Sequence, residues 1–538
     1  SHTVSTSAFP AFGNVSLEAT NDVNYTATTG FSATSTDLHI SAGNNVNFSG
    51  NNLDISVGSL NITAGGQANF TSTQDMNIVT FGAGTGNFTV QAASIAFNVG
   101  DNLFINNSND MRLTATTGDV RIDYDSDSTI MAGNITLQAT NGSVIIDSTF
   151  DQPLTLGAPN KASLLAAQDV IIHLGSSQTA QQTQDLNLPT TDVEFNAGRD
   201  LSIRVNDITG TANLDFQAGR NLTLRNDNGG SNFTINANNI TMSAGGDLNI
   251  TAGKDIDLRS SSDLRLTAGN NLVATAEGIF GSNAFQSTEL RATSGNLTIQ
   301  VDQSGPESSI ISPTGNIQLS AGNQLTLATN NTADFRIESQ NSVELSGQDI
   351  VLDLGRGAGG GQAGLLVVAP SLTMDATQAV TVNASFFNNG STGETLIQGH
   401  DVRFANSDSA LNLNINQSSL TINATNDLIF DVAGDLEVDV GASTGTGDFN
   451  LQAGNQLTAT STDNQSWDVH LDGPPGDYYV WVATDRNDAI SPVDVIVEEI
   501  DAPRQGESCE APFDDTVDFW DDDNTGLSDR PLGPAWYI

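Results

Sequence analysis

The histidines and glycines of this chain do not form a recognisable catalytic or nucleotide-binding motif. The five histidines are dispersed, with no HxH or HxxxH spacing that would hold a metal ion: His2, His39, His173, His400 and His470. We therefore expect them to be surface residues. Residues 355–360 match GxGxxG, but the apolar segment that follows, 364–370, has the pattern of a strand. Because no helix N-terminus follows to hold a phosphate, we interpret 355–360 as a glycine loop.

Two acidic segments offer more chemistry. Asp521, Asp523 and Thr525 supply side-chain oxygens at alternate positions, as in the first half of a calcium loop. Leu532 stands where such a loop carries its bidentate acid, so a solvated acidic turn is the alternative. Asp123–Asp127 has an aspartate at every second position, on one side of an extended segment. An enzyme would need paired carboxylates, or a calcium ion held by aspartates, beside an arginine in one groove.

Sequons for N-glycosylation, Asn-x-Ser/Thr, recur along the chain. In a strand such as Asn221-Leu-Thr-Leu the leucines face inward, so Asn221 faces solvent, where it could carry a covalent glycan. An alternating polar and apolar strand also produces this pattern without any modification, so both interpretations stay open. The candidate asparagines are Asn14, Asn24, Asn47, Asn61, Asn69, Asn134, Asn221, Asn232, Asn249, Asn296 and Asn423.

Composition excludes several classes of protein. Across 538 residues, 63 Asp+Glu oppose 17 Lys+Arg, giving a formal net charge of −46, which would repel a nucleic-acid backbone. No apolar run is long enough for a membrane-spanning helix. Cys509 is the single cysteine, which excludes an internal disulfide. The chain starts at Ser1 without Met or an apolar leader, as expected of a mature or trimmed product.

A short repeat dominates the sequence. Its unit is Ala-Gly, one polar residue, Asn or Asp, and then a strand that alternates apolar and polar residues, as in SAGGDLNI from Ser243 and TAGKDIDLRS from Thr251. We expect the glycine to supply a turn with positive φ before each strand. The alternation predicts ten inward side chains: Leu222, Leu224, Leu248, Ile250, Ile256, Leu258, Leu264, Leu266, Leu325 and Leu327.

The spacing of the repeats predicts a β-solenoid. Neighbouring strands begin about eight residues apart and the longer period is about 22 residues, so two or three strands form each lap. Each lap then stacks on the previous one, and no lap is stable alone. An array of β-sandwiches is the competing fold, but it would have longer strands and more aromatic residues than the 6% found here.

The repeat, AG-[GNKR]-[DN]-[LVI]-x-[ILF], resembles that of filamentous-haemagglutinin-type β-solenoids. The match is best over 196–462 and looser over 1–151. The resemblance implies a right-handed parallel β-helix used in adhesion or as an extracellular fibre. It is weak over 152–191 and 355–400, which we expect to be insertions that bulge from the rod. The Asn-Pro-Asn motifs of that family's secretion domain do not occur, so its secretion route does not carry over.

The two ends of the chain differ from the repeats. Residues 1–13 are apolar and nearly uncharged, which suits a docking strand. All four tryptophans lie beyond Asp463, where we expect a small β module over 464–500 and an acidic, proline-rich tail over 501–538. The predicted architecture is therefore all-β: a long parallel β-solenoid rod over 14–463, followed by a small C-terminal β module and the tail.

These features predict a structural protein rather than an enzyme. We expect a subunit of an extracellular or cell-surface filament or adhesive stalk that binds further copies of itself head to tail. Covalent N-glycans, calcium ions and extracellular glycans are candidate additions, while a nucleic-acid partner is excluded. The expected assembly interface joins apolar residues of the first segment to aromatic residues of the C-terminal module: Val4, Phe9, Phe12, Trp467, Tyr479 and Trp481.

Two alternatives come from other functional classes. One is a carbohydrate-active enzyme, a polysaccharide lyase or hydrolase, built on a β-helix. The other is a solenoid that binds glycans or ice through flat threonine rows, for which the candidates are Thr114 with Thr116, and Thr458 with Thr460 and Thr462. The threonine alternative requires such pairs to stack in register on one face.

Overall fold

The computed structural model describes most of the chain from the second residue to residue 469. The described residues are 2–4, 8–9, 13–81, 86–148, 153–175, 184–210, 213–227, 232–276, 280–301, 307–329, 335–354, 364–388, 393–406, 411–415, 419–432, 436–440, 448–453, 456–461 and 468–469.

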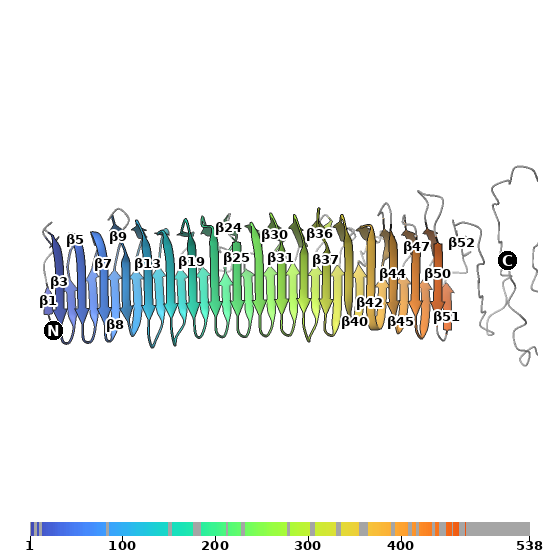
Figure 1. Ribbon diagram of the computed structural model, residues 1–538, viewed down its shortest axis with the longest axis horizontal. Helices are drawn as coiled ribbons and strands as arrows, with labels where there is room; N and C mark the ends of the chain where they lie inside the picture. Colours follow the sequence, from blue (N-terminus) through green and yellow to red (C-terminus); the bar gives the residue numbers. More distant parts are fainter. Residues whose placement is uncertain are drawn as a thin grey trace, which may run out of the picture.

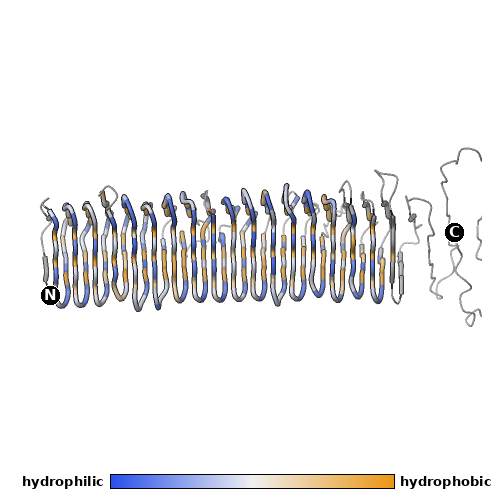
Figure 2. Tube along the Cα trace, in the orientation of Figure 1, coloured by the Kyte–Doolittle hydropathy of each residue, from blue (hydrophilic) through white to orange (hydrophobic). Residues whose placement is uncertain are grey.

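The described chain is a β-solenoid with three faces, and it contains no helix (Figure 1). Every strand pairing is parallel, and a strand typically pairs with the third strand before it and the third strand after it. One lap therefore contributes one strand to each of three sheets, which we name face 1, face 2 and face 3. Hydrophilic and hydrophobic colours alternate along the coloured part of the trace (Figure 2), and the strands alternate buried and outward residues, as in β26 (Leu222–Asn226) and β29 (Leu248–Ala252).

Face 1 contains the strand that follows most copies of the repeat motif; the copy from Thr251 instead precedes β30 (Ile256–Ser260), a strand of face 2. The strands of face 1 are β1 (His2–Val4), β4 (Val23–Thr26), β6 (Val46–Gly50), β8 (Gln67–Ser72), β11 (Ser94–Val99), β14 (Val120–Tyr124), β17 (Val144–Ser148), β20 (Val170–Leu174), β23 (Leu201–Arg204), β26 (Leu222–Asn226), β29 (Leu248–Ala252), β32 (Leu272–Ala276), β35 (Leu297–Val301), β38 (Gln324–Thr329), β45 (Asp401–Asn406), β48 (Asp427–Val432) and β51 (Gln456–Ser461).

Face 2 is the second sheet of each lap. Its strands are β2 (Ala8–Phe9), β9 (Met76–Thr80), β12 (Leu103–Asn107), β15 (Ser128–Met131), β18 (Leu154–Gly157), β21 (Leu186–Leu188), β24 (Ile208–Gly210), β27 (Phe233–Ala237), β30 (Ile256–Ser260), β33 (Phe280–Ala284), β36 (Ser308–Ser312), β39 (Phe335–Ser339), β41 (Gly364–Val368), β43 (Ser385–Asn388), β46 (Leu411–Ile415), β49 (Leu436–Val440) and β52 (Asp468–Val469).

Face 3 completes each lap. Its strands are β3 (Asn14–Ala19), β10 (Phe88–Ala92), β13 (Asp110–Ala115), β16 (Asn134–Ala139), β19 (Lys161–Ala166), β22 (Asp192–Ala197), β25 (Asn213–Ala218), β28 (Asn239–Ala244), β31 (Leu264–Ala268), β34 (Thr288–Ala292), β37 (Ile317–Ala321), β44 (Glu394–Gly399), β47 (Ser419–Ala424) and β50 (Asp448–Ala453). Four long strands turn a corner: β5 (Phe31–Ala42) and β7 (Leu53–Ala64) run from face 2 to face 3, and β40 (Ser342–Leu354) and β42 (Ser371–Asn383) run from face 3 to face 1.

Apolar side chains fill the space between the three sheets. All ten residues predicted to face inward are at most 1% exposed, which confirms the predicted strand pattern. Like residues stack on like residues from lap to lap. Tyr25, Phe48, Phe70 and Phe97 form one such stack on face 1, with successive ring centroids 4.7, 5.3 and 4.5 Å apart.

The corner between face 3 and face 1 contains a continuous series of side-chain to backbone hydrogen bonds. From Asp169 to Asn296, the side-chain Oδ1 of the Asn or Asp at this corner accepts the backbone N–H of the equivalent residue one lap later, at 2.9–3.3 Å. We call this series the corner ladder. Its members include Asp169, Asp200, Asn221, Asp247, Asn271 and Asn296.

The glycine of the repeat has a different role from the one predicted. Among described glycines, only Gly13, Gly175 and Gly393 have positive φ, so the expectation of a positive-φ turn before each strand is wrong. Gly198, Gly219, Gly245 and Gly269 instead stack at the corner, where a Cβ on each of the last three would collide with the carbonyl oxygen of the glycine one lap earlier. Close approach of successive laps therefore requires glycine here.

The lap length and the rod boundaries also differ from expectation. Equivalent corner residues are separated by 21 residues between Asp200 and Asn221 but by 31 between Asp169 and Asp200, because the connections between faces vary. The expected insertions over 152–191 and 355–400 contain β18 to β21 and β41 to β44, whose strands pair within the rod. These stretches lack the Ala-Gly motif but retain the alternation that places a strand in the stack.

The strands at the ends of the described chain belong to the solenoid as well. In the predicted docking segment, 1–13, β1 pairs with β4 and β2 pairs with β5 of the same chain. At the other end β52 pairs with β49, so the rod extends past residue 463. The remainder of the predicted β module over 464–500 and the tail over 501–538 lie outside the described residues.

The corner glycines give a direct test of lap spacing. Gly219→Ala should destabilise the protein by about 1–3 kcal/mol, because the added methyl group forces two laps apart. Gly281→Ala is the matched control: its Cβ would lie 3.6 Å from Ile256 O, an ordinary contact, and the melting temperature should stay the same or rise. Thermal unfolding followed by circular dichroism measures both, and equal melting temperatures for the two variants would contradict the packing argument.

Candidate functional site

The structure places the sequon asparagines where the strand pattern predicts, on the outside of the solenoid, exposed or half-buried. Six of them bond to side chains or backbone of neighbouring laps. In one series on face 1, Asn69 donates to Asn47 at 2.8 Å and Asn47 donates to Asn24 at 2.7 Å. The six are Asn24, Asn47, Asn69, Asn134, Asn221 and Asn296. These sequons therefore serve the stacking of laps, whether or not any carries a glycan.

The other predicted site residues are not brought together by the described structure. Val4 and Phe9 lie in β1 and β2, and their backbones pair within the chain. Phe12, Trp467, Tyr479 and Trp481 lie outside the described residues, as do the calcium-loop residues Asp521, Asp523 and Thr525. Among the described residues, no group of three or more His, Cys, Asp or Glu side chains is arranged to hold a metal ion.

The threonine pairs do not form a row. On face 3, Thr114 of β13 stacks between Gln91 of β10 and Gln138 of β16. The outward column at this position is therefore of mixed polar residues, and the requirement of the ice-binding alternative is not met there. Thr458 and Thr460 pair in register with Ile429 and Asp431, so they do not continue a threonine row either.

The most varied chemistry lies in one outward column of face 1. Strand register places five ionisable residues one above the other on successive laps: Asp123, Asp147, His173, Arg204 and Arg225. We call this set the charged column. Asp123 of the Asp123–Asp127 segment thus lies beside Asp147, which in turn lies beside His173 on the following lap.

Arg121 connects the two carboxylates at the start of the charged column. Its Nε lies 2.6 Å from Asp123 Oδ2 and its Nη2 lies 3.7 Å from Asp147 Oδ2. Burial raises the pKa of Asp123 above its ordinary value, although Arg121 opposes the shift. The enzyme alternative requires paired carboxylates beside an arginine in one groove, whereas these three residues lie on the surface of a sheet and line neither depression described below.

His173 lies in the middle of the charged column and is half-buried, whereas the sequence suggested a surface histidine. Burial lowers its pKa, so the ring is neutral at neutral pH. Its Nε2 lies 3.2 Å from Ser202 Oγ, the residue types of a nucleophile and its base. However, Asp147 makes no hydrogen bond to the imidazole in the described structure, so no carboxylate fixes the ring as in a catalytic triad.

Ion pairs link acids and cations on the same or adjacent laps. Asp169 pairs with Arg199, and Asp200 pairs with Arg220. Each arginine lowers the pKa of its partner carboxyl, which also accepts a backbone N–H of the corner ladder. Of the Lys and Arg residues in the described part of the chain, only Arg112 and Arg291 have no ion pair.

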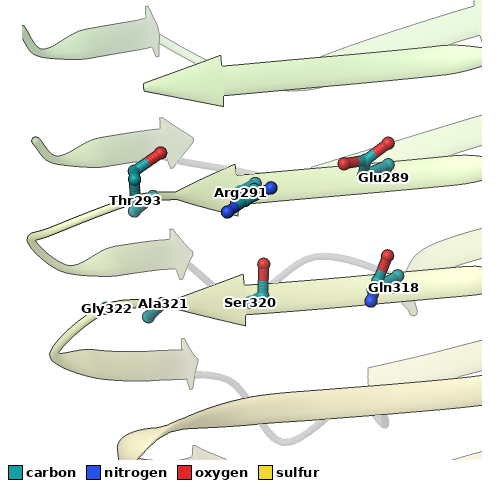
Figure 3. Close-up of a pocket in the computed structure, with 8 residues that line it drawn as sticks. Glu289, Arg291, Thr293, Gln318, Ser320, Ala321 and Gly322 are labelled. Atoms are coloured by element: carbon teal, nitrogen blue, oxygen red, sulfur yellow. The ribbon is translucent and has the colours of Figure 1, made fainter. Parts of the chain in front are cut away.

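Arg291 lines a shallow, open depression on face 3, shown in Figure 3. The depression has a volume of about 400 Å³ and lies over β34 and β37, with Glu289, Thr293, Gln318 and Ser320 among its lining residues. A second depression of about 200 Å³ adjoins it over β31, because Glu289 and Gln318 line both. No residue of the charged column lines either depression.

Comparisons with known proteins identify no relative. No protein-family model matches the chain, and no curated protein and no solved structure matches it. The resemblance to filamentous-haemagglutinin-type repeats therefore rests on the repeat motif alone. No helix in the described part of the chain is long and apolar enough to cross a membrane.

Replacing Asp123 or Asp200 by Asn should change the melting temperature at pH 7 in opposite directions. Burial raises the pKa of Asp123, so its ionisation costs stability as the pH rises, and Asp123→Asn should melt at a higher temperature than the wild type at pH 7. Arg220 lowers the pKa of Asp200, so this carboxylate stabilises the fold at pH 7 and Asp200→Asn should melt at a lower temperature.

The difference in melting temperature between each variant and the wild type should become smaller as the pH is lowered. Asp123 gains its proton as the pH falls through its raised pKa, which removes the cost of its ionisation. The stabilisation that the Asp200 carboxylate contributes is lost as the pH falls from about 3.9 through its depressed pKa. Circular-dichroism melts between pH 7 and about pH 3 measure this. Shifts of the same sign for the two variants at pH 7 would contradict the assignment.

Proposed function

We propose that this chain is a structural subunit of an extracellular filament or adhesive stalk, in which copies join head to tail. The observation that carries the proposal is the continuous stack of laps: parallel strand pairing runs from β1 to β52, with mostly apolar residues inside and polar residues outside. Such a body is stiff because each internal lap is hydrogen-bonded through its strands to the lap before it and the lap after it.

The corner ladder gives the stack a direction. In every rung the earlier lap accepts and the later lap donates, for example Asp200 N–H to Asp169 Oδ1 and Asn221 N–H to Asp200 Oδ1. A second rod extends this pattern only when its first lap meets the last lap of its neighbour. This supports a heterologous, head-to-tail contact, which propagates into a filament.

The surface charge favours end-to-end contact over lateral contact. The formal charge of −46 makes rods repel one another side by side within a Debye length of about 8 Å at physiological salt. The stacking contacts are short-range hydrogen bonds and apolar contacts, which salt screens little. Growth along the axis is therefore the assembly mode that the charge permits.

Imaging tests the assembly. Electron microscopy of the 538-residue chain should show end-to-end chains one rod wide that lengthen as concentration rises.

The free edge of β3 offers a position at which to block assembly. Odd-numbered residues of this segment bond toward β5: Gly13 O accepts Thr36 N–H and Ala19 O accepts Gly43 N–H. Ser16 is even-numbered, so its N–H points toward the opposite edge of the strand. No strand pairs there among the described residues.

Ser16→Pro should block a strand from pairing at this edge and leave single rods, because proline has no N–H to donate. Ser16→Ala keeps the N–H and is the matched control, which should assemble like the parent. Single rods of the parent at every concentration, or unchanged chains of Ser16→Pro, would overturn the assembly model.

We also propose N-glycans on the sequon asparagines outside the inter-lap hydrogen bonds: Asn14, Asn61, Asn232, Asn249 and Asn423. These residues face outward and make no side-chain hydrogen bond with a described residue. Intact-mass measurement of material from the native source, before and after deglycosylation, should show a loss of mass. A mass that already equals the mass of the bare polypeptide would leave the sequons with a purely structural role.

A further inference from the structure

The two adjoining depressions on face 3 form one polar strip that crosses three laps. They lie over β31, β34 and β37, and their lining residues are mostly polar and outward-facing. Their shared residues, Glu289 and Gln318, lie on adjacent strands in direct register. The strip is therefore continuous along the rod axis, at a lap spacing of about 4.8 Å.

The lining side chains offer both donors and acceptors. Arg291 is exposed and makes no ion pair or hydrogen bond with any described residue, so its guanidinium N–H groups are available. Glu289 Oε2 accepts from Arg265 Nε at 2.7 Å, which fixes the carboxylate while its other oxygen can accept. Gln318 donates its amide to Glu344 at 3.2 Å, which leaves its carbonyl oxygen as an acceptor.

Figure 3 shows how these groups are arranged. Glu289, Arg291 and Thr293 follow one another along β34 and the turn after it, and Gln318 and Ser320 lie beside them on β37. Hydroxyl, amide, carboxylate and guanidinium groups thus alternate over a small area, and no aromatic side chain lines it. A ligand that fits must itself present closely spaced groups that both donate and accept hydrogen bonds.

The charge around the strip selects against an anion. Arg265 and Arg291 are balanced by Asp263 and Glu289, with Glu344 on the next lap. The whole chain carries a formal charge of −46. The carboxylates of an acidic ligand would therefore lie beside carboxylates of the protein and would also be repelled by its overall negative charge.

We propose that the strip over β31, β34 and β37 binds a neutral glycan strand that lies along the rod axis. Vicinal hydroxyl groups of one sugar receive hydrogen bonds from Arg291 and donate to Glu289, and the next sugar along the axis meets Gln318 and Ser320. This binding role is separate from end-to-end assembly and does not depend on it.

Isothermal titration with neutral and acidic hexamers tests the proposal. The probes are cellohexaose, maltohexaose and a galacturonate hexamer, each titrated into the full chain. At least one neutral hexamer should bind with a dissociation constant of about 1 mM or below, because an open site buries little of its ligand. The galacturonate hexamer should bind more weakly than that neutral hexamer.

Two variants remove the recognising groups, and a third serves as the control. Arg291→Ala and Gln318→Ala should each weaken binding of the neutral hexamer by tenfold or more, with unchanged circular-dichroism melts because both side chains are exposed. Arg259→Ala removes an exposed arginine from face 2, where it pairs with Asp257, and should leave binding unchanged.

Three results would overturn the site. The first is that neither neutral hexamer binds, and the second is that the galacturonate hexamer binds more tightly than both. The third is that Arg259→Ala weakens binding as much as Arg291→Ala, which would indicate a non-specific effect of charge. Microscopy of the same samples reports assembly independently, so failure of the binding site is distinguishable from failure of the filament model.

Discussion

The close stacking of laps at the corner between face 3 and face 1 is the constraint on which the rest of the structure depends. Two backbones approach there so closely that Gly219, Gly245 and Gly269 leave no space for a Cβ. The Asn or Asp two positions after each glycine then accepts an amide of the next lap. Because this contact fixes where β26, β29 and β32 start on face 1, it also fixes the register of the apolar rows behind them.

Much of the fold could be predicted from the sequence, because both of its main signals are local. Alternation within a strand identifies the inward residues, and Leu258 and Leu266 are buried as it predicts. The role of the repeat glycine could not be predicted, because a sequence does not show which carbonyl group will lie against it. The stretch 152–191 differs from the predicted insertion for a related reason: it lacks the Ala-Gly motif, yet β19 and β20 keep the strand alternation and stack within the rod.

The candidate sites were largely hidden from sequence analysis because they lie across laps of unequal length. Asp147, His173 and Arg204 are direct neighbours in the stack, although the lap between the first two is shorter than the lap between the last two. A repeat of fixed period would therefore not align them. Because the connections between faces vary in length, the sequence shows where each strand lies but not which residues stack beside one another on adjacent laps. The depression at Arg291 escapes detection for the same reason, since Glu289 and Gln318 come from different laps.

Inter-lap hydrogen bonds also determine which surface groups remain for binding. The asparagines of the face 1 series bond to one another, and almost every described cation is held by an acid on the same or the adjacent lap. These side chains stabilise the stack, and most of their hydrogen-bonding and charge-pairing groups are already bonded within the rod and so are not available to a binding partner. Specific recognition by such a rod must therefore use the few positions where a side chain has no partner in the stack. Arg291 is one such position: the register that pairs Arg265 with Glu289 places Arg291 opposite Thr267 and Ser320, neither of which is an acid.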